Sequence, residues 1–147
     1  MDIPRIFEIA ESAHRIHNPF TPEKYATLGR VLRLESGTSV LDLGSGSGEM
    51  LCTWARDHGI NGTGIDMSRL FSEQAKRRAE DLGVAGQVNF IHDDAAGHIS
   101  DQKVGVAACV GATWIGGGVA GVIDLLSKSL AANGVVLIGE PYWLKQP

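Results

Sequence analysis

The chain has 147 residues, of which 44% are hydrophobic and 20% charged, and its formal net charge is −4 at pH 7. This length and apolar content predict a single soluble domain with one core. The acidic balance argues against a nucleic-acid-binding protein, because such proteins usually carry a basic patch. The two cysteines, Cys52 and Cys109, form neither a CxxC pair nor a zinc spacing, which predicts core residues in a reduced, cytoplasmic protein.

Several local patterns are interpreted as ordinary structure. The charged N-terminus lacks the apolar segment of a signal peptide. His14 and His17 form an HxxH pair, but no further ligands lie near them in sequence, so no metal site is predicted. Residues 104–123 carry no charge over 20 positions, which is long enough for a membrane helix. Six of these residues are glycine and the first part has the pattern of a buried parallel strand, so no membrane span is predicted.

In chain order, residues 1–20 are predicted to form an arm or a short helix, and residues 21–147 the main domain. The sequence Asn18-Pro19-Phe20 ends the arm. Thr21 and Pro22 then begin a helix, because threonine caps a helix and proline fits its first turn. Gly37 is expected to end this helix. Its apolar face is predicted to hold Tyr25, Leu28, Val31 and Leu32.

A unit of short apolar strand, glycine or acidic turn and amphipathic helix then repeats. Alternating strands and helices predict a parallel sheet with helices on both faces, and ligands bind beyond the carboxyl ends of such strands. The predicted strands are 39–43, 62–65, 88–92, 104–110 and 135–139. The predicted helices are 49–58, one between Ser68 and Gly83, and one that runs from Val119 through Leu130 to Asn133-Gly134.

A glycine-rich turn follows the first strand and reads Asp42-Leu43-Gly44-Ser45-Gly46-Ser47-Gly48-Glu49. Glycines there let the backbone turn sharply and approach a ligand closely. The dinucleotide motif GxGxxG requires a third glycine where this chain has Glu49. Asp42 and Glu49 would together repel a pyrophosphate, and they therefore indicate a ligand that carries a cation.

Acidic residues also follow the next two strands. Asp66 lies 22 positions after Gly44, and an acid at that spacing accepts hydrogen bonds from ribose hydroxyls. The alternative for Asp66 is an ordinary turn residue before the next helix. The third strand ends in Asp93-Asp94-Ala95, and the fourth in Val110 followed by Gly111 to Trp114.

Residues 42–48, 64–68 and 94–95 resemble successive motifs of class I S-adenosylmethionine (SAM)-dependent methyltransferases. The resemblance covers most of the chain and is close to an uncharacterised bacterial group. It implies a Rossmann-like α/β fold, mainly a parallel sheet with helices on both faces and an antiparallel hairpin at one edge. Only five of the family's seven strands are predicted before Pro147, so we expect residues 21–147 to be a SAM-binding domain that lacks its C-terminal strands.

The resemblance also implies the roles of individual residues. Asp42 would support the methionine end of the cofactor and Asp66 would bind the ribose hydroxyls. Met67 would pack on the adenine, Asp94 would accept from its amino group, and the backbone of Val110 would receive the methionine ammonium. The cofactor-binding residues implied in this way are Asp42, Gly44, Ser45, Gly46, Gly48, Asp66, Met67, Asp94, Ala95 and Val110.

The reaction implied is methyl transfer from SAM to an acceptor. Methyltransferases that act on amino groups of nucleic acid often carry Asn/Asp-Pro-Pro-Tyr after the fourth strand, and Gly111 to Trp114 differ from it. A small-molecule acceptor is therefore predicted. Glu140 and His17 are weak candidates for a general base, which is needed only if the acceptor loses a proton.

Two other functions stay open at this point: a non-catalytic SAM-binding module or inactive fragment, and a nicotinamide-dependent oxidoreductase.

The residues from His14 to Tyr25 are expected to close over the cofactor. The fifth strand, Val135 to Gly139, has an unpaired outer edge in this reading, and such edges associate. We therefore predict that this edge is covered by the chain's own tail or by a second copy in a homodimer.

Overall fold

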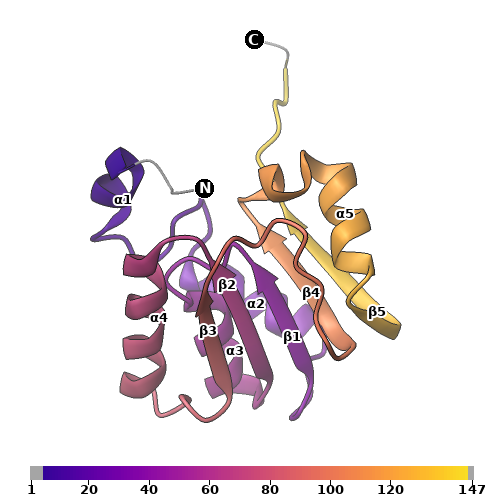
Figure 1. Cartoon of the computed structure of the whole chain (residues 1–147). Helices are drawn as coiled ribbons and strands as arrows, with labels where there is room; N and C mark the ends of the chain where they lie inside the picture. The colour runs from indigo at the N-terminus through magenta and orange to yellow at the C-terminus, as the bar shows by residue number, and fades with distance from the viewer. Residues whose placement is uncertain (1–4, 146–147) are drawn as a thin grey trace.

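The computed structural model describes residues 5–145 and contains one five-stranded sheet in the order β3-β2-β1-β4-β5. Neighbouring strands all run parallel, and Figure 1 shows helices on both faces of the sheet. The strands are β1 (Ser39–Leu43), β2 (Asn61–Asp66), β3 (Val88–His92), β4 (Val104–Val110) and β5 (Leu130–Gly139). The helices are α1 (Arg5–Glu11), α2 (Pro22–Val31), α3 (Glu49–His58), α4 (Arg69–Asp81), α5 (Val119–Ser127) and the short 3-10 helix η1 (Thr113–Gly116).

The fold class predicted from the sequence is confirmed. The bounds of β1, β3, β4 and α3 agree with the prediction, and β2 is one residue longer at each end than predicted. Ser68 caps α4 as predicted, because its side chain accepts a hydrogen bond from the backbone N–H of Phe71. Parallel strands joined by helices therefore follow here from local patterns in the sequence.

The sheet separates two apolar clusters that form the core. One cluster lies under α2, α3 and α4 and includes Trp54, which is fully buried. The other lies under α5 and includes Leu126. Cys52 belongs to the first cluster and Cys109 to the second, and both are free and buried, as predicted. Burial on both sides explains why these strands are nearly continuous apolar runs.

The predicted end of α2 is wrong. The helix ends at Val31, and the left-handed residue that follows is Arg33, with φ of 51°, whereas Gly37 lies beyond the helix in the turn before β1. Val31 is 70% exposed, so it does not belong to the buried face that the sequence predicted. Tyr25 and Gly29 are the buried residues of α2, and Trp54 and His58 of α3 approach closely at Gly29. Leu28 and Leu32 are partly buried and pack against the same cluster, as predicted.

The predicted border between α5 and β5 is also wrong. Helix α5 ends at Ser127, and Leu130 is the first residue of β5, where it pairs with Val104. The register then shifts, and regular pairing resumes at Val135 opposite Val106. Asn133, with φ of 65°, therefore lies in an irregularity of the strand instead of ending a helix. Pairing with β4 decides this border, and helical spacing in the sequence does not reveal it.

The uncharged stretch at 104–123 is divided among β4, η1 and the start of α5. Among the helices at residues 5–145, none is long and apolar enough to cross a membrane. The same residues contain no group of three or more His, Cys, Asp or Glu side chains placed to hold a metal ion. The HxxH pair is instead part of the arm: His14 contacts Glu11, and His17 lies against Phe71.

Candidate functional site

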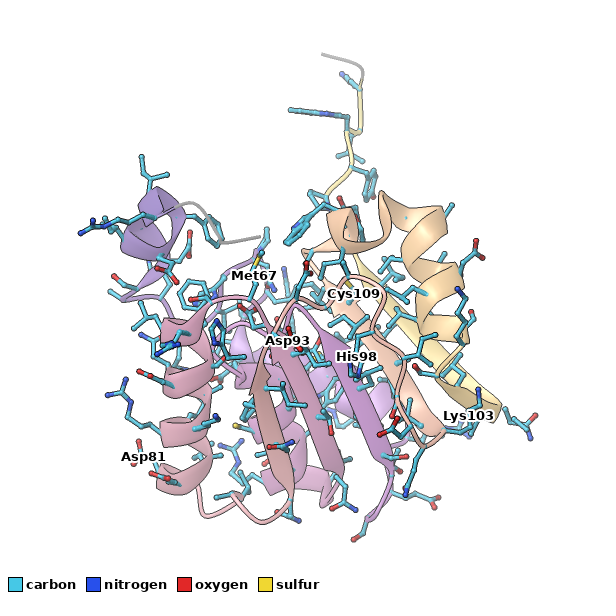
Figure 2. The ribbon with its side chains drawn as sticks, in the orientation of Figure 1. Met67, Asp81, Asp93, His98, Lys103 and Cys109 are labelled. Carbon is cyan, nitrogen blue, oxygen red and sulfur yellow. The ribbon has the colours of Figure 1, made fainter. Side chains whose placement is uncertain are left out.

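A cavity lies at the carboxyl ends of β1, β2 and β4, where the strand order reverses direction around β1. Such a switch point is where open α/β sheets bind ligands. Figure 2 shows Met67 at this edge of the sheet, on the side where α1 and the C-terminal tail lie in Figure 1. The cavity is lined by nine of the predicted cofactor-binding residues: Asp42, Gly44, Ser45, Gly46, Asp66, Met67, Asp94, Ala95 and Val110.

Gly48 is the one predicted cofactor-binding residue that does not line the cavity. It precedes α3 with φ of 75°, a left-handed conformation that favours glycine. A Cβ atom at this position would lie 2.6 Å from Phe90 Cζ and 2.8 Å from Ala75 Cβ. Gly48 therefore lets the glycine turn pack against α4 and β3, and its contribution to the cavity is indirect.

Asp66 holds the glycine turn in place. Its Oδ2 accepts a hydrogen bond of 2.8 Å from the backbone N–H of Gly46, and its Oδ1 accepts one of 2.9 Å from that of Ser68. Burial raises the pKa of Asp66, and the two backbone N–H donors oppose that rise. The carboxylate thus joins the end of β2 to the turn after β1, and it faces the cavity from that position.

Asp42 is the most electrostatically unusual group in the cavity. It is 4% exposed, and among the described residues nothing forms a hydrogen bond with its Oδ1. Burial, with a further contribution from Asp66, raises the pKa of Asp42 to about 7. A buried carboxylate without a partner is unfavourable, so a cationic group in the cavity would be bound strongly here.

Glu49 does not contribute free negative charge to the site. Its Oε1 lies 2.6 Å from Arg15 Nη2, and its Oε2 lies 3.1 Å from Arg78 Nε. The sequence interpretation that two uncompensated acids flank the turn therefore holds for Asp42 only. Asp42 is the acid of this turn with an unpartnered oxygen, and Asp66 is a further acid in the cavity lining.

The arm forms one wall of the cavity, and this wall includes residues of the segment from His14 to Tyr25 that was expected to close over the cofactor. His17 Nε2 lies 3.1 Å from the His14 carbonyl oxygen and 2.8 Å from Ser47 Oγ. A carbonyl can only accept, so Nε2 carries the proton and Nδ1 is free to accept one. Burial lowers the pKa of His17, which favours the neutral ring. The arm residues that line the cavity are Phe7, Arg15, Ile16, His17 and Asn18.

Glu140, the other weak candidate for a base, lies outside the cavity lining. Its Oε2 accepts a hydrogen bond of 2.7 Å from Thr113 Oγ1, which ties the end of β5 to η1. Neighbours of Thr113 do reach the cavity, and one of them, Trp114, is 58% exposed at its rim. The sequence analysis named Gly111 to Trp114 as the residues that follow the fourth strand, but it gave them no role in cofactor binding. Outside the arm, the cavity-lining residues that it did not single out are Met50, Phe71 and Ile115.

Comparisons with known proteins agree with this geometry. The profile of the methyltransferase domain family matches residues 40–134. The uncharacterized protein YjhP of Escherichia coli K12 is 72% identical over 147 residues, which is all of this chain and 59% of YjhP.

Two solved structures are also similar, and both are SAM-dependent methyltransferases in complex with S-adenosyl-L-homocysteine. The one from Geobacter sulfurreducens is 75% identical with a TM-score of 0.97, over 99% of this chain. The one from Thiobacillus denitrificans is 77% identical with a TM-score of 0.97, over all of this chain. The chain spans 59% of the length of each of these relatives.

Proposed function

Because this chain belongs to the SAM-dependent methyltransferase family, we propose that it binds S-adenosyl-L-methionine in the cavity at the strand ends and transfers its methyl group to a small-molecule acceptor. The observation that carries the proposal is the pair of buried acids, Asp42 and Asp66, at the ends of two adjacent strands around a glycine turn. The cofactor has the matching groups, since it carries an ammonium, a sulfonium and a ribose.

Each part of the cofactor has a corresponding group in the cavity. We assign the cationic methionine end to Asp42 and the backbone at Val110, because Asp42 has an unpartnered buried oxygen. The ribose hydroxyls are assigned to Asp66, which retains acceptor capacity beside its two backbone donors. Met67 follows β2 and Asp94 lies in the loop after β3, and both are assigned to the adenine.

Methyl transfer requires alignment of the reacting groups and exclusion of water more than it requires acid–base catalysis. The sulfonium is a good leaving group, so the main tasks of the protein are to hold the reacting atoms in line and to exclude water. The arm serves the second task, since Ile16 and His17 cover one side of the cavity. Of the two predicted candidates for a base, His17 lines the cavity and Glu140 does not, so Nδ1 of His17 is the one that we assign if the acceptor loses a proton.

We expect Asp66→Ala to lower the affinity for S-adenosyl-L-homocysteine by about 1.5–3 kcal/mol, which is roughly tenfold or more. The reason is the loss of charge-assisted hydrogen bonds to the ribose. Isothermal titration calorimetry measures the effect. Asp124→Ala is the matched control, because Asp124 is exposed on α5 and lies outside the cavity lining. An unchanged affinity in Asp66→Ala would show that the ribose assignment is wrong.

Two measurements separate this function from its alternatives. Calorimetry with NAD tests the nicotinamide-dependent alternative, which predicts binding of NAD; the absent third glycine and the buried Asp42 both disfavour a pyrophosphate there. A methyl-transfer assay on a panel of small molecules tests whether the domain only binds SAM. The cytoplasm remains our predicted compartment, since the free, buried Cys52 and Cys109 suit reducing conditions.

We also propose that two copies of the chain pair through the outer edge of β5. Within residues 5–145, no strand pairs with that edge, and unpaired strand edges associate. A two-fold axis would give an isologous contact. Val135 on this strand is 42% exposed, whereas Val136 packs into the cluster under α5. Val135 is therefore a better position for a test of edge pairing than Val136.

Sedimentation at micromolar concentration is expected to give the mass of a dimer for this chain and of a monomer for Val135→Lys, because a charge on an edge strand opposes pairing. Val31→Lys is the matched control. It places the same charge on an exposed valine of a helix, outside the edge strand, and should leave the dimer intact. A monomeric mass for the unaltered chain, or a dimer that Val135→Lys does not affect, would contradict edge pairing.

A further inference from the structure

The carboxylate of Glu49 joins two parts of the structure that meet at the cavity. Glu49 is the first residue of α3 and is 6% exposed. One of its oxygens holds Arg78 of α4, which also donates to the backbone carbonyl of Ser47 in the glycine turn. The other oxygen holds Arg15 of the arm. A single buried group therefore connects the arm to the turn that lines the cavity.

Further hydrogen bonds join the same two parts. Ser47 Oγ lies 2.8 Å from His17 of the arm and donates to Gln74 Oε1 of α4 at 3.1 Å. Gln74 in turn donates a bond of 2.8 Å to the backbone carbonyl of Ser12. Helix α1 has no buried residue, and the side chain of Arg15 is 60% exposed. Apolar contacts also hold the arm, since Ile16 and Phe20 pack against the cluster under α2, α3 and α4, and Phe7 and His17 lie against Phe71. The polar contacts add to these and are the ones that reach the glycine turn.

We propose that Glu49 is a positioning residue that couples closure of the arm to cofactor binding. This inference rests on the proposed function, since it concerns the same cavity. Glu49 lines the cavity, but Arg15 and Arg78 engage its two carboxylate oxygens, so it acts through these two side chains. With Arg15 in place, the arm covers the cavity and the charge of the carboxylate is compensated on both sides. Without Arg15, the arm loses its charged contact with α3, and Arg78 alone holds the buried carboxylate.

Coupling of this kind is reciprocal. If the closed arm favours the bound cofactor, the bound cofactor must stabilise the closed arm by the same factor. The ion pair of Glu49 and Arg78 differs from an ordinary surface ion pair, which contributes little to stability, because both side chains are largely shielded from solvent. Arg15 supplies the exposed half of the network, so its removal should not disturb the core.

We expect Arg15→Gln to lower the affinity for S-adenosyl-L-homocysteine by about fivefold or more and to leave the thermal unfolding midpoint without cofactor unchanged. Calorimetry with S-adenosyl-L-homocysteine gives the affinity. In the bound state, amide hydrogen exchange at residues 12–18 should become faster than in the unaltered chain. Arg15→Lys should recover part of the affinity, because it keeps the charge but not the planar donor.

The control is Arg30→Gln, which removes the same charge from α2, where the side chain contacts Thr27. It should bind as the unaltered chain does. A double-variant comparison then isolates Glu49: in a Glu49→Gln background, Arg15→Gln should weaken binding no further. If it does weaken binding further, Arg15 contacts the cofactor directly and the inference is wrong.

Failure of the inference and failure of the proposed function give different results. If the unaltered chain binds S-adenosyl-L-homocysteine and Arg15→Gln binds it equally well, the coupling is absent while the proposed cofactor site stands. If the unaltered chain does not bind it at all, the proposed function fails. Should Glu49→Gln not fold, the comparison of Arg15→Gln with Arg30→Gln still decides whether the arm is coupled to the site.

Discussion

Above pH 7, replacing Asp42 by asparagine is expected to increase the free energy of unfolding by up to about 4 kcal/mol and, at the same time, to weaken cofactor binding. The rise in the pKa of Asp42 from its ordinary 3.8 to about 7 corresponds to a free energy of that order. Asparagine has nearly the same shape and carries no charge, so it removes the unfavourable buried ion. The variant should therefore be more stable and less able to bind.

The direction in which stability changes with pH follows from proton binding at Asp42. The raised pKa means that the folded protein holds a proton at Asp42 between about pH 4 and pH 7, where the unfolded chain has lost it. Stability from this group is thus fully present below pH 4 and declines as the pH rises to 7. Denaturant unfolding between pH 5 and 8 measures the decline, which Asp42→Asn should reduce. If the free energy of unfolding depended on pH in the same way in both proteins, the pKa of Asp42 would not be raised.

Cofactor binding should show the opposite dependence on pH at the same residue. A cationic ligand favours the ionised carboxylate and lowers its pKa, so binding near pH 6 should release a proton and affinity should rise toward pH 8. Calorimetry in two buffers of different ionisation enthalpy measures the released proton. Asp42→Asn should bind with an affinity that no longer depends on pH in this range.

The second large effect is expected from Gly48→Ala, which should destabilise the fold by about 3 kcal/mol. A left-handed residue other than glycine costs about 1–2 kcal/mol, and crowding of a packed site costs about 1–3 kcal/mol more. The crowding is specific, because the added methyl would meet Phe90 and Ala75, both of which are buried. Urea unfolding measures the change.

Gly83→Ala separates the two contributions to this effect. Gly83 has φ of 70°, close to that of Gly48, but an added Cβ atom there would have no neighbour within 4 Å. Its substitution should therefore show the conformational part alone, about 1–2 kcal/mol. Equal losses in the two variants would contradict the view that close packing of Gly48 positions the glycine turn.

Much of the sheet and of the candidate site could be predicted from the sequence. The strands are apolar runs bounded by glycine or acidic residues, and their ends meet at one edge of a parallel sheet, which brought Asp42, Asp66 and Asp94 together on paper and in the structure. The helix start at Ser68 was equally clear, because a capping serine precedes an amphipathic pattern. Both features depend on residues that are close together in the sequence, so a sequence pattern can predict them.

The remainder depends on contacts between distant residues. Leu130 fits the periodicity of α5, and only its pairing with Val104 assigns it to β5. The pairing of Glu49 with Arg15 joins residues 34 positions apart, so no spacing rule predicts it. The segment from His14 to Tyr25 was expected from its polar, proline-broken sequence to close over the cofactor, and part of it lines the cavity. The side-chain contacts that hold it there, such as Arg15 with Glu49 and His17 with Ser47, could not be predicted.

The strand order has a consequence for how this chain folds. Central strand β1 pairs with β2 at Val40–Gly62 and with β4 at Val40–Val106, so the two loops to be closed span 22 and 66 residues. Tripling the loop length adds about 1 kcal/mol of closure entropy, and distant pairings of this kind slow folding. During synthesis β1 can find β2 early but must wait for β4. The interior of the sheet is thus exposed on one side until residue 106 and its neighbours have left the ribosome.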